Sequence, residues 1–377
     1  MRPVSDTFLQ ALRSSHRSVS RLVVLDPVTF TTLGTLSGED GFLLEGGVSM
    51  VRSRAIRRTC EVTLANPGGE WTPVEPGDWL GVNSLVRLDR GMYLDPDTVE
   101  WCTLGHFLLG RPRVVVDAKG STVVASGEDR AKLLVRSRFT VPTTYPAGAR
   151  LADVFRTEAQ AAGMGATRYR LDDTGKVLAA PRTFEEDESR DKALGNLARD
   201  YGLELFADAD GYLACAPPPN PVTAAVAWNY APGEAAILTT LTKEWTDDRL
   251  YNHVLVTGES ADPATPPVRA EAMDTNPASP AYVNGPLGDR LYRYTSAMIT
   301  TTAQAQEVAL NLLAEVALLE ESISLGAVTH PALEPGDAIT VLEPLSRTEG
   351  KYLVDDVEVP LGLGAQTLGT RVVRGFA

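Results

Sequence analysis

The sequence predicts a protein of the α+β class that is mainly β, with two related β-barrel domains flanking a small α/β domain. Short β-branched runs separated by turn residues fill both ends of the chain, and helical periodicity takes over in a central segment. In addition, one pattern of strand and turn residues occurs twice. Brief strands with turn chemistry between them are typical of sandwiches and barrels.

The composition indicates an ordinary multidomain globular protein. A chain of 377 residues is longer than one core needs and predicts two or three domains. A hydrophobic share of 44% is enough to bury several cores. No run approaches the roughly 18 apolar residues of a membrane span, and Met1–Asp6 lacks the apolar run of a signal peptide. We therefore expect folding in the cytoplasm and no membrane span.

Charge and cysteine usage exclude two further classes. The net charge is -14, whereas surfaces that grip nucleic-acid phosphates are basic, so stable nucleic-acid binding is not expected. Cys60, Cys102 and Cys215 are odd in number and contain no C-x-x-C pair. They fit neither a disulfide framework nor a zinc site, and we expect buried, reduced thiols.

The N-terminal third is expected to hold an arm and the first barrel. Residues 1–18 predict a helical arm, because Ser5 can cap a short helix with Phe8 and Leu12 on one face. The first β-barrel domain is expected at 19–134. Its predicted strands lie at 22–25, 42–44, 60–64, 85–88, 107–109, 114–116 and 123–125. Each run is short and bounded by Gly, Pro, Asn or Asp.

The small α/β domain is expected at 135–216. Apolar residues recur at helical spacing from Leu151 to Ala159 and again from Ser189 to Tyr201. The run from Leu203 to Ala216 predicts a hairpin around the turn Asp208-Ala209-Asp210-Gly211.

A Pro-rich run at 217–221 predicts a linker, because Pro neither donates to a strand ladder nor continues a helix. The second β-barrel domain is expected at 217–377. Its expected elements are a strand near 250–258, a long inserted loop at 259–289, an apolar-striped helix at 302–321 and strands from 323 to the end.

The pattern that occurs twice is built around the letters E-P-G-D. Residues 74–82 are echoed by 333–341, and the downstream run Gly105–Leu109 is echoed by Gly350–Val354. Pro fixes φ, Gly accepts a positive φ, and the following Asp can bond local backbone. The structural turn residues that this predicts are Pro76, Gly77, Asp78, Pro335, Gly336 and Asp337.

Two interpretations of the repeat are open. Coincidence is one, because Pro-Gly-Asp turns are common and either turn alone carries no information. The other is a barrel duplicated within the chain. It is favoured because a strand, the turn and a second strand recur in the same order.

No catalytic, cofactor or metal site is predicted. His16, His106, His253 and His330 show no metal-ligand spacing, and no G-x-S-x-G elbow is present. The Gly-rich segment 362–369 lacks the helix that should follow a phosphate loop. We therefore expect a protein that is not an enzyme and holds no cofactor.

Acidic residues supply the remaining candidates. Residues 208–211 resemble the start of a calcium loop, but Pro219 stands where the bidentate Glu belongs. Paired carboxylates at 172–173, 247–248 and 355–356 would suit a glycosidase. In an acidic protein such pairs are usually solvated turns, which is the interpretation we favour.

Several stretches resemble the hub proteins of phage tails and related contractile injection machines. Met1–His16 looks like the start of minor tail proteins from phages of high-GC bacteria. Arg58–Pro67 is similar to the first-barrel segment of tail-tip proteins, and Trp245–Gly258 looks like the strand that opens the second barrel of a hub. Leu333–Val354 resembles the closing region of that barrel.

The resemblance implies a structural, non-enzymatic hub of the tail tip, or baseplate. In that family a homotrimer of two-barrel subunits presents six barrels in a ring, which lets threefold symmetry meet the sixfold tail tube. Its partners would be the distal tail protein, the tape measure protein and other tail-tip or fibre proteins. DNA would be transient cargo in a lumen whose negative charge repels it. The protein would act in the virion, at the tail tip, after assembly in the host cytoplasm.

Two alternative functions remain open on the sequence. A distal tail protein would form hexamers of a single barrel, and the second E-P-G-D copy argues against it. A cell-wall-binding or cell-wall-degrading tail-associated protein is motivated by the carboxylate pairs and the scattered Trp residues.

Overall fold

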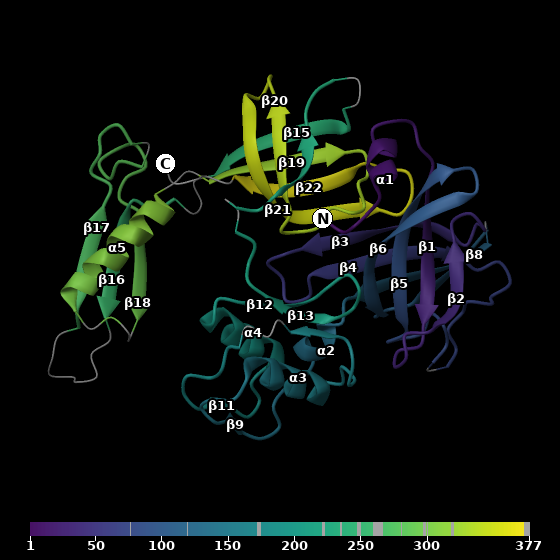
Figure 1. The fold of residues 1–377 in the computed structure, drawn as a ribbon, viewed down its shortest axis with the longest axis horizontal. Coiled ribbons are helices and arrows are strands. Elements are labelled where there is room, and N and C mark those ends of the chain that lie inside the picture. The colour runs from purple at the N-terminus through teal and green to yellow at the C-terminus, as the bar shows by residue number, and fades with distance from the viewer. Residues whose placement is uncertain are drawn as a thin grey trace. The chain divides into compact units, whose positions relative to one another are not determined.

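The computed structural model describes residues 1–372 except 76, 119, 172–174, 221–222, 234–235, 247–249, 259–266, 280, 297–298, 300 and 318–319. The chain forms two compact units, one of residues 1–241 with 324–377 and one of residues 242–323. The strands β15 (Leu238–Thr246) and β19 (Glu320–Ala327) cross the boundaries between them. Figure 1 labels most of the helices and strands.

The first part of the chain is a run of strands after one short helix. In order, these elements are α1 (Asp6–Ala11), β1 (Ser18–Leu25), β2 (Thr32–Ser37), β3 (Leu43–Val51), β4 (Arg58–Ala65), β5 (Leu85–Asp95), β6 (Thr98–Leu109), β7 (Arg113–Asp117) and β8 (Gly120–Glu128). Side chains alternate along β4, where Cys60, Val62 and Leu64 are buried and Glu61 is exposed. This two-residue period is that of a strand with one face on a core. All seven strands predicted in this region are confirmed.

The N-terminal helix forms where the sequence predicts it. Ser5 caps α1, since its hydroxyl accepts a hydrogen bond from the Phe8 N–H at 3.1 Å. Phe8 and Leu12 are buried, so the helix is held by its apolar face.

The strands of the C-terminal part continue one large sheet. They are β14 (Val226–Tyr230), β15, β19, β20 (Ala338–Glu343), β21 (Thr348–Pro360) and β22 (Gln366–Val372). The 14-stranded sheet has the order β15-β19-β22-β21-β3-β4-β8-β6-β5-β1-β2, with β7 on β8, β20 on β21 and β14 on β20. The pairings whose register is described are antiparallel, except that of β14 with β20.

The prediction of a mainly β, α+β protein is confirmed, but the barrels are not seen as closed structures. Among the residues that the structure describes, no ladder closes either half of the sheet on itself. Side-chain contacts link strands that share no ladder. For example, the Ser20 hydroxyl donates to the Leu361 carbonyl at 2.7 Å.

The central segment forms the helical part of the first unit. Its elements are α2 (Lys132–Val135), β9 (Thr143–Tyr145), α3 (Leu151–Ala161), β10 (Tyr169–Leu171), β11 (Arg182–Phe184), α4 (Arg190–Asp200), β12 (Glu204–Ala207) and β13 (Leu213–Ala216). Both predicted helices are confirmed, as is the hairpin of β12 and β13. Its turn closes through the Gly211 N–H, which donates to the Asp208 carbonyl at 3.0 Å.

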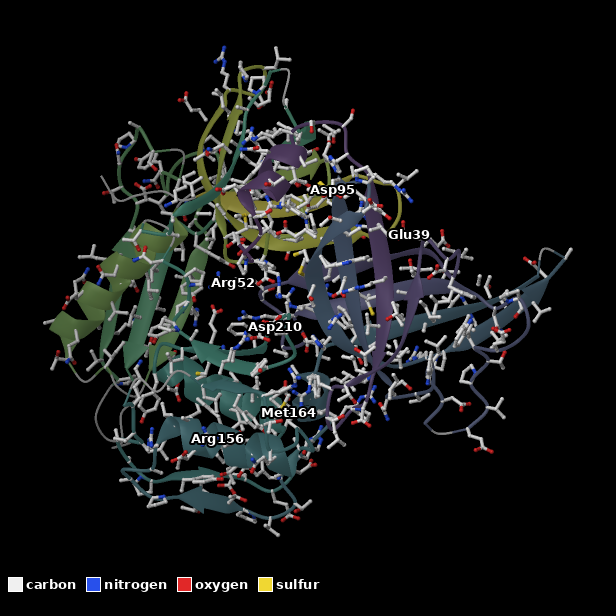
Figure 2. All side chains as sticks on the ribbon, turned by 45° about the vertical axis from the view of Figure 1, so that its right-hand side comes forward. Glu39, Arg52, Asp95, Arg156, Met164 and Asp210 are labelled. Atoms are coloured by element: carbon white, nitrogen blue, oxygen red, sulfur yellow. The ribbon has the colours of Figure 1, made fainter. Side chains whose placement is uncertain are left out.

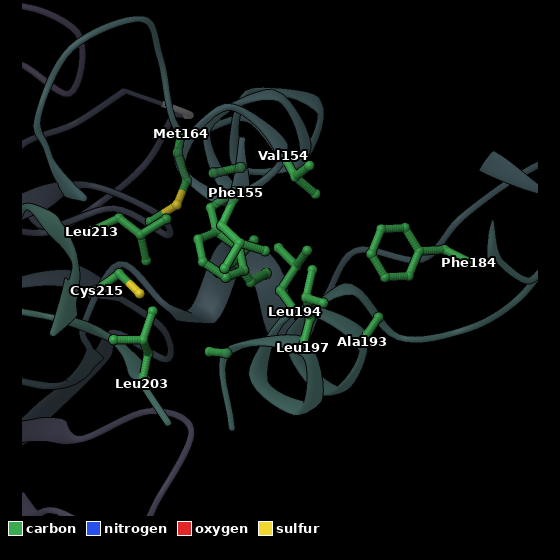
Figure 3. Packing of buried hydrophobic residues seen from close by; sticks show 14 of the residues in the cluster. Val154, Phe155, Met164, Phe184, Ala193, Leu194, Leu197, Leu203, Leu213 and Cys215 are labelled. Atoms are coloured by element: carbon green, nitrogen blue, oxygen red, sulfur yellow. The ribbon is translucent and has the colours of Figure 1, made fainter. Parts of the chain in front are cut away.

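The two helices share a core with that hairpin. Phe155 from α3, Leu194 and Leu197 from α4, and Leu213 and Cys215 from β13 are all buried in one cluster (Figure 3). The helical stripe and the strand alternation thus meet at a single apolar layer.

The second unit consists of one helix on a small sheet. Strands β17 (Arg269–Met273), β16 (His253–Gly258) and β18 (Leu291–Ser296) pair in that order, and α5 (Thr302–Val316) packs on them. The core contains Val254, Val256, Ala305 and Ala309.

Two sequence predictions in this unit need correction. The stretch 259–289 was expected to be a loop, but β17 lies within it and pairs antiparallel with β16. Its alternating Ala270 and Ala272 are too small to give a clear apolar signal, yet they are buried. The helix expected at 302–321 ends at Val316, and Glu320 already belongs to β19. Within the described residues, no helix is long and apolar enough to cross a membrane.

Leu194→Ala tests the core of the helical segment. The side chain is fully buried, so its truncation leaves a cavity and should lower the free energy of unfolding by about 3 kcal/mol. Val141→Ala is the control, because Val141 is 62% exposed and its loss should cost less than about 0.5 kcal/mol. Urea denaturation followed by circular dichroism measures both. Equal effects of the two changes would contradict the packing described here.

Candidate functional site

The large sheet contains the same arrangement of strands twice. In the first half the spatial order is β3-β4-β8-β6-β5-β1, and in the second half it is β15-β19-β22-β21-β20-β14. Replacing each strand by its counterpart in chain order, from β1 and β14 to β8 and β22, converts one series into the other. A six-strand arrangement that recurs in full is far more specific than a shared turn.

The two halves also differ in specific places. The strand β1 runs antiparallel to β5, whereas its counterpart β14 runs parallel to β20. The first half carries an extra edge strand, β2. The whole segment from 247 to 319 stands between β15 and β19, where the first half has only the short turn from 52 to 57 between β3 and β4. The second compact unit is therefore an insertion at a hairpin turn, where insertions are best tolerated.

The register of one hairpin is identical in both halves. The pairs are Leu85 with Leu108, Val86 with Phe107, Arg87 with His106 and Leu88 with Gly105 in the first half. In the second half they are Ala338 with Leu353, Ile339 with Tyr352, Thr340 with Lys351 and Val341 with Gly350. The runs Gly105–Leu109 and Gly350–Val354, matched in the sequence, thus face matching positions on their partner strands.

The E-P-G-D turns have the same local geometry. The φ angles of Gly77 and Gly336 are 105° and 98°, in the region that favours glycine. The Asp78 N–H donates to the Glu75 carbonyl at 3.2 Å, and the Asp78 carboxylate accepts from the Glu75 N–H at 2.8 Å.

At the second turn, the Asp337 N–H donates to the Glu334 carbonyl at 3.1 Å and its carboxylate accepts from the Glu334 N–H at 2.8 Å. Among the six predicted turn residues, Pro76 lies outside the described residues. Pro335 precedes Gly336 in the second turn.

The two turns stand at different distances from the hairpin that they precede. Gly336 donates its N–H to Val354 at 2.7 Å, but the residue that makes this bond in the first half is Asn83, which donates to Leu109 at 2.8 Å. Asn83 also has a positive φ of 66°. In the hairpin register, Asn83 rather than Gly77 is the counterpart of Gly336, because residues 79–84 are interposed after the first turn.

A seam of backbone hydrogen bonds joins the two halves. The second part of β21 pairs with β3, from Asp356 opposite Val51 to Pro360 opposite Gly47. The ladder continues through the Leu361 N–H, which donates to the Gly46 carbonyl at 2.9 Å. The halves are therefore one continuous sheet.

Side chains reinforce this seam. The guanidinium of Arg90 donates to the carbonyls of Pro360 and Gly362. Burial lowers the pKa of Arg90 to about 10, so the side chain still carries its charge at neutral pH. A buried cation on two carbonyls ties β5 to the end of β21.

A cluster of charges occupies the second turn. Glu334 lies 3.0 Å from the guanidinium of Arg58 and 3.5 Å from that of Arg2, and the amino group of Met1 bonds the Asp337 carboxylate. Burial alone would raise the pKa of Glu334, but the charges of Arg58, Arg2 and the amino terminus together lower it. Burial raises the pKa of Asp337 despite the amino terminus. Sequence reasoning singled out the turn but missed Arg2 and Arg58, which come from distant parts of the chain.

Glu334→Gln tests this cluster. Removing the carboxylate leaves Arg58 and Arg2 without their shared counter-charge, and the free energy of unfolding at pH 7 should fall by about 2 kcal/mol. The matched control is Glu349→Gln, because Glu349 is an exposed carboxylate on β21, the strand that pairs with β20 just after the turn. Urea denaturation at pH 7 measures both variants. A Glu334 variant as stable as the control would refute a stabilising role for the cluster.

The helical segment is attached to the first half by ionic and carbonyl contacts. Glu204 on β12 bonds Arg52 at 2.5 Å and Arg57 at 2.6 Å, and the β12–β13 turn bonds Arg2 through Asp210 at 2.6 Å. Figure 2 shows Arg52 and Asp210 between the large sheet and the central segment on which Met164 and Arg156 are labelled.

His106 and Arg130 bind the same β12–β13 turn through its backbone. The His106 Nδ1 lies 2.8 Å from the Ala209 carbonyl, and Arg130 donates to the Gly211 carbonyl at 2.6 Å. Burial lowers the pKa of His106 to about 4, so its ring is neutral in the folded chain at pH 7. A neutral ring that donates from Nδ1 fits this contact.

The low pKa of His106 predicts a loss of stability in acid. An unfolded chain protonates this histidine below about pH 6.5 while the folded chain does not, so stability is present above that pH and declines as pH falls toward 4. The loss is about 3 kcal/mol for this residue. The variant His106→Gln should be less stable at pH 7, with a flatter decline in unfolding free energy between pH 6.5 and pH 4. An unchanged slope would contradict a buried neutral imidazole.

The structure describes some of the residues that motivated the enzymatic alternatives. Among the residues that the structure describes, no group of three or more His, Cys, Asp or Glu side chains is placed to hold a metal ion. Cys60, Cys102 and Cys215 are buried and form no disulfide, and burial raises the pKa of Cys60 and Cys102, the latter to about 12. The carboxylate pairs at 172–173 and 247–248 lie outside the described residues.

Comparisons with solved structures identify a fold shared with phage tail proteins. A tail protein from Neisseria meningitidis MC58 aligns with a TM-score of 0.66 at 13% identity, over 94% of this chain and 96% of that one. The 43 kDa tail protein of prophage MuSo2 from Shewanella oneidensis aligns with a TM-score of 0.64 at 11% identity, over 95% and 98%. Prophage tail protein gp18 from Listeria monocytogenes EGD-e aligns with a TM-score of 0.53 at 11% identity, over 94% of each chain.

A chain of the Francisella PdpA–VgrG complex also aligns, with a TM-score of 0.56 at 9% identity over 95% of this chain and 58% of that one. No protein-family model and no curated protein matches the sequence. The predicted resemblance to phage tail and injection-machine proteins is confirmed at the level of the fold.

Proposed function

We propose that the chain is a structural hub of a phage tail tip, or baseplate, in which a homotrimer forms a ring of six equivalent modules between the tail tube and the tip. Near-complete alignment with three tail proteins supports a role in a tail. The repeat of six strands in one polypeptide carries the more specific part of the proposal.

Symmetry explains why the repeat favours a hub. A ring built from three copies of a two-module chain presents six similar modules, so it can meet a sixfold partner on one face and a threefold partner on the other. A single module per chain would need six copies. The modules in this proposal are β-barrels, the first at 19–134 and the second at 217–377 with residues 242–323 inserted, flanking the α/β domain at 135–216.

The charge of the chain supports a passage for DNA. A net charge of -14 disfavours adhesion of a polyanion, so a ring of this protein would let a duplex slide through by like-charge repulsion. The partners in this proposal are a distal tail protein, a tape measure protein and further tail-tip or fibre proteins, within the virion. The chain is proposed to act without catalysis and without a cofactor.

The mass of the assembled protein tests the proposal. Native mass spectrometry over a range of protein concentrations should show a species of three times the 40.5 kDa chain mass. A hexamer would instead support a distal tail protein. A chain that stays monomeric at every concentration, or that binds or cleaves host peptidoglycan, would contradict a hub.

A further inference from the structure

The internal repeat gives a counterpart to the seam between β21 and β3. The strand β6 ends at Leu109, and β7 begins at Arg113 after three residues that belong to no strand. Its counterpart β21 instead runs without interruption into the seam. The pair Leu108 with Glu128 in the first half matches the pair Leu353 with Arg371 in the second. In both halves, the next matching pair lies five residues later on the first strand and four residues earlier on its partner. These pairs are Arg113 with Val124 and Glu358 with Thr367. The strand β7 is therefore the first half's copy of the seam-forming part of β21.

In the isolated chain, β7 has an open edge. Within the described part of the chain its only ladder partner is β8. All five of its residues are exposed, and they include Val114, Val115 and Val116, of which Val116 is 75% exposed. An exposed strand edge lined by valines is a template for another strand.

The direction of the backbone groups shows which of them face the open edge. The Gly110 N–H donates to the Ser126 carbonyl at 2.7 Å. On β8, the backbone N–H and C=O groups of the even-numbered residues therefore point toward β6 and β7. Val115 therefore uses its N–H and C=O within the hairpin, opposite Thr122. The N–H and C=O of Val116 point the other way, out of the hairpin.

A matching edge lies at the far end of the sheet. The strand β15 is the counterpart of β3, and both have nine residues. Just before each strand, Phe42 and Ile237 accept a 2.8 Å hydrogen bond from Ala65 and Val328 respectively, so the two strands begin at equivalent points. Among the described residues β15 has β19 on one side only, whereas β3 has β4 and β21.

We propose that β7 of one copy adds to the open edge of β15 of the next copy, which repeats between chains the seam that β21 and β3 form within the chain. The proposal rests on the hub function and names its interface. Such strand addition satisfies the backbone groups of both edges and packs the valine side chains of β7 beside those of β15. The contact joins two different surfaces, and the repeat predicts that it closes after three copies because each chain supplies two equivalent steps.

The register of the internal seam predicts the contacts of the new one. Glu358 lies opposite Ser49, and the Leu361 N–H donates to the Gly46 carbonyl. The counterparts are Arg113 opposite Glu244 of the next copy, and the Val116 N–H donating to the Leu241 carbonyl of the next copy. Arg113 and Glu244 are exposed and carry opposite charges, which favours this register in an antiparallel pair.

Val116→Pro tests the edge without disturbing the hairpin. Proline removes the outward N–H and is tolerated at a position whose N–H faces solvent, so the monomer should fold as before. The protein concentration at half assembly should rise roughly tenfold or more, as measured by native mass spectrometry. Thr35→Pro is the matched control on the edge strand β2. The Gly38 N–H donates to the Ser20 carbonyl, so the alternation directs the Thr35 N–H outward there too.

A charge swap tests the register. Arg113→Glu and Glu244→Arg each place like charges opposite one another and should weaken assembly, whereas the double variant restores the pair and should assemble as the native chain does. Circular dichroism checks that each variant is folded. Two single variants whose effects simply add in the double variant would overturn the register.

The outcomes separate the interface from the hub function. If the native chain trimerises and Val116→Pro trimerises equally well, the β7–β15 seam is wrong and the hub proposal stands. If the native chain never trimerises, both are overturned. Loss of assembly in Thr35→Pro as well as in Val116→Pro would also overturn the seam, because a proline on any edge strand would then weaken assembly, whether or not that strand lies at the proposed interface.

Discussion

The ladder between β21 and β3 is the constraint on which the rest of the structure depends. Five residue pairs, from Asp356–Val51 to Pro360–Gly47, turn two similar sets of strands into a single sheet. Backbone hydrogen bonds fix register as well as proximity, because a slip of one residue would send every side chain to the opposite face. Arg90 adds a buried cation across the same junction. The orientation of one module against the other is therefore built into the main chain.

Charged side chains bind the remaining parts to this junction. Arg2 bonds Asp210 of the helical segment and lies near Glu334 of the second turn, so the N-terminal arm holds two distant segments together. Arg52 and Arg57 share Glu204 in the same way. These pairs are partly buried and hydrogen-bonded, so removing one partner leaves a charge uncompensated even where the pair contributes little net stability. They place the helical segment against the first module.

Local patterns made the secondary structure predictable, and tertiary contacts explain what was missed. The apolar stripe that contains Phe155 predicts its helix from residues within a few positions of one another. The turn at 208–211 is likewise predicted by its own four residues. The strand β17 is not, because its buried residues are alanines in a segment rich in loop formers. The repeat was visible in the sequence, but the true partner of Gly336 in the hairpin register is Asn83, which no motif links to it. Arg58 and Glu334 are brought together only by the fold.

The repeat matters because a chain that contains the same module twice can continue its own internal contact into an assembly. An electron cryomicroscopy map of the purified ring tests this most directly. The account predicts six modules around one channel, with the rotation between modules of neighbouring chains equal to that between the two modules of one chain. Modules at different radii or heights, or joined by a surface other than a strand ladder, would contradict it.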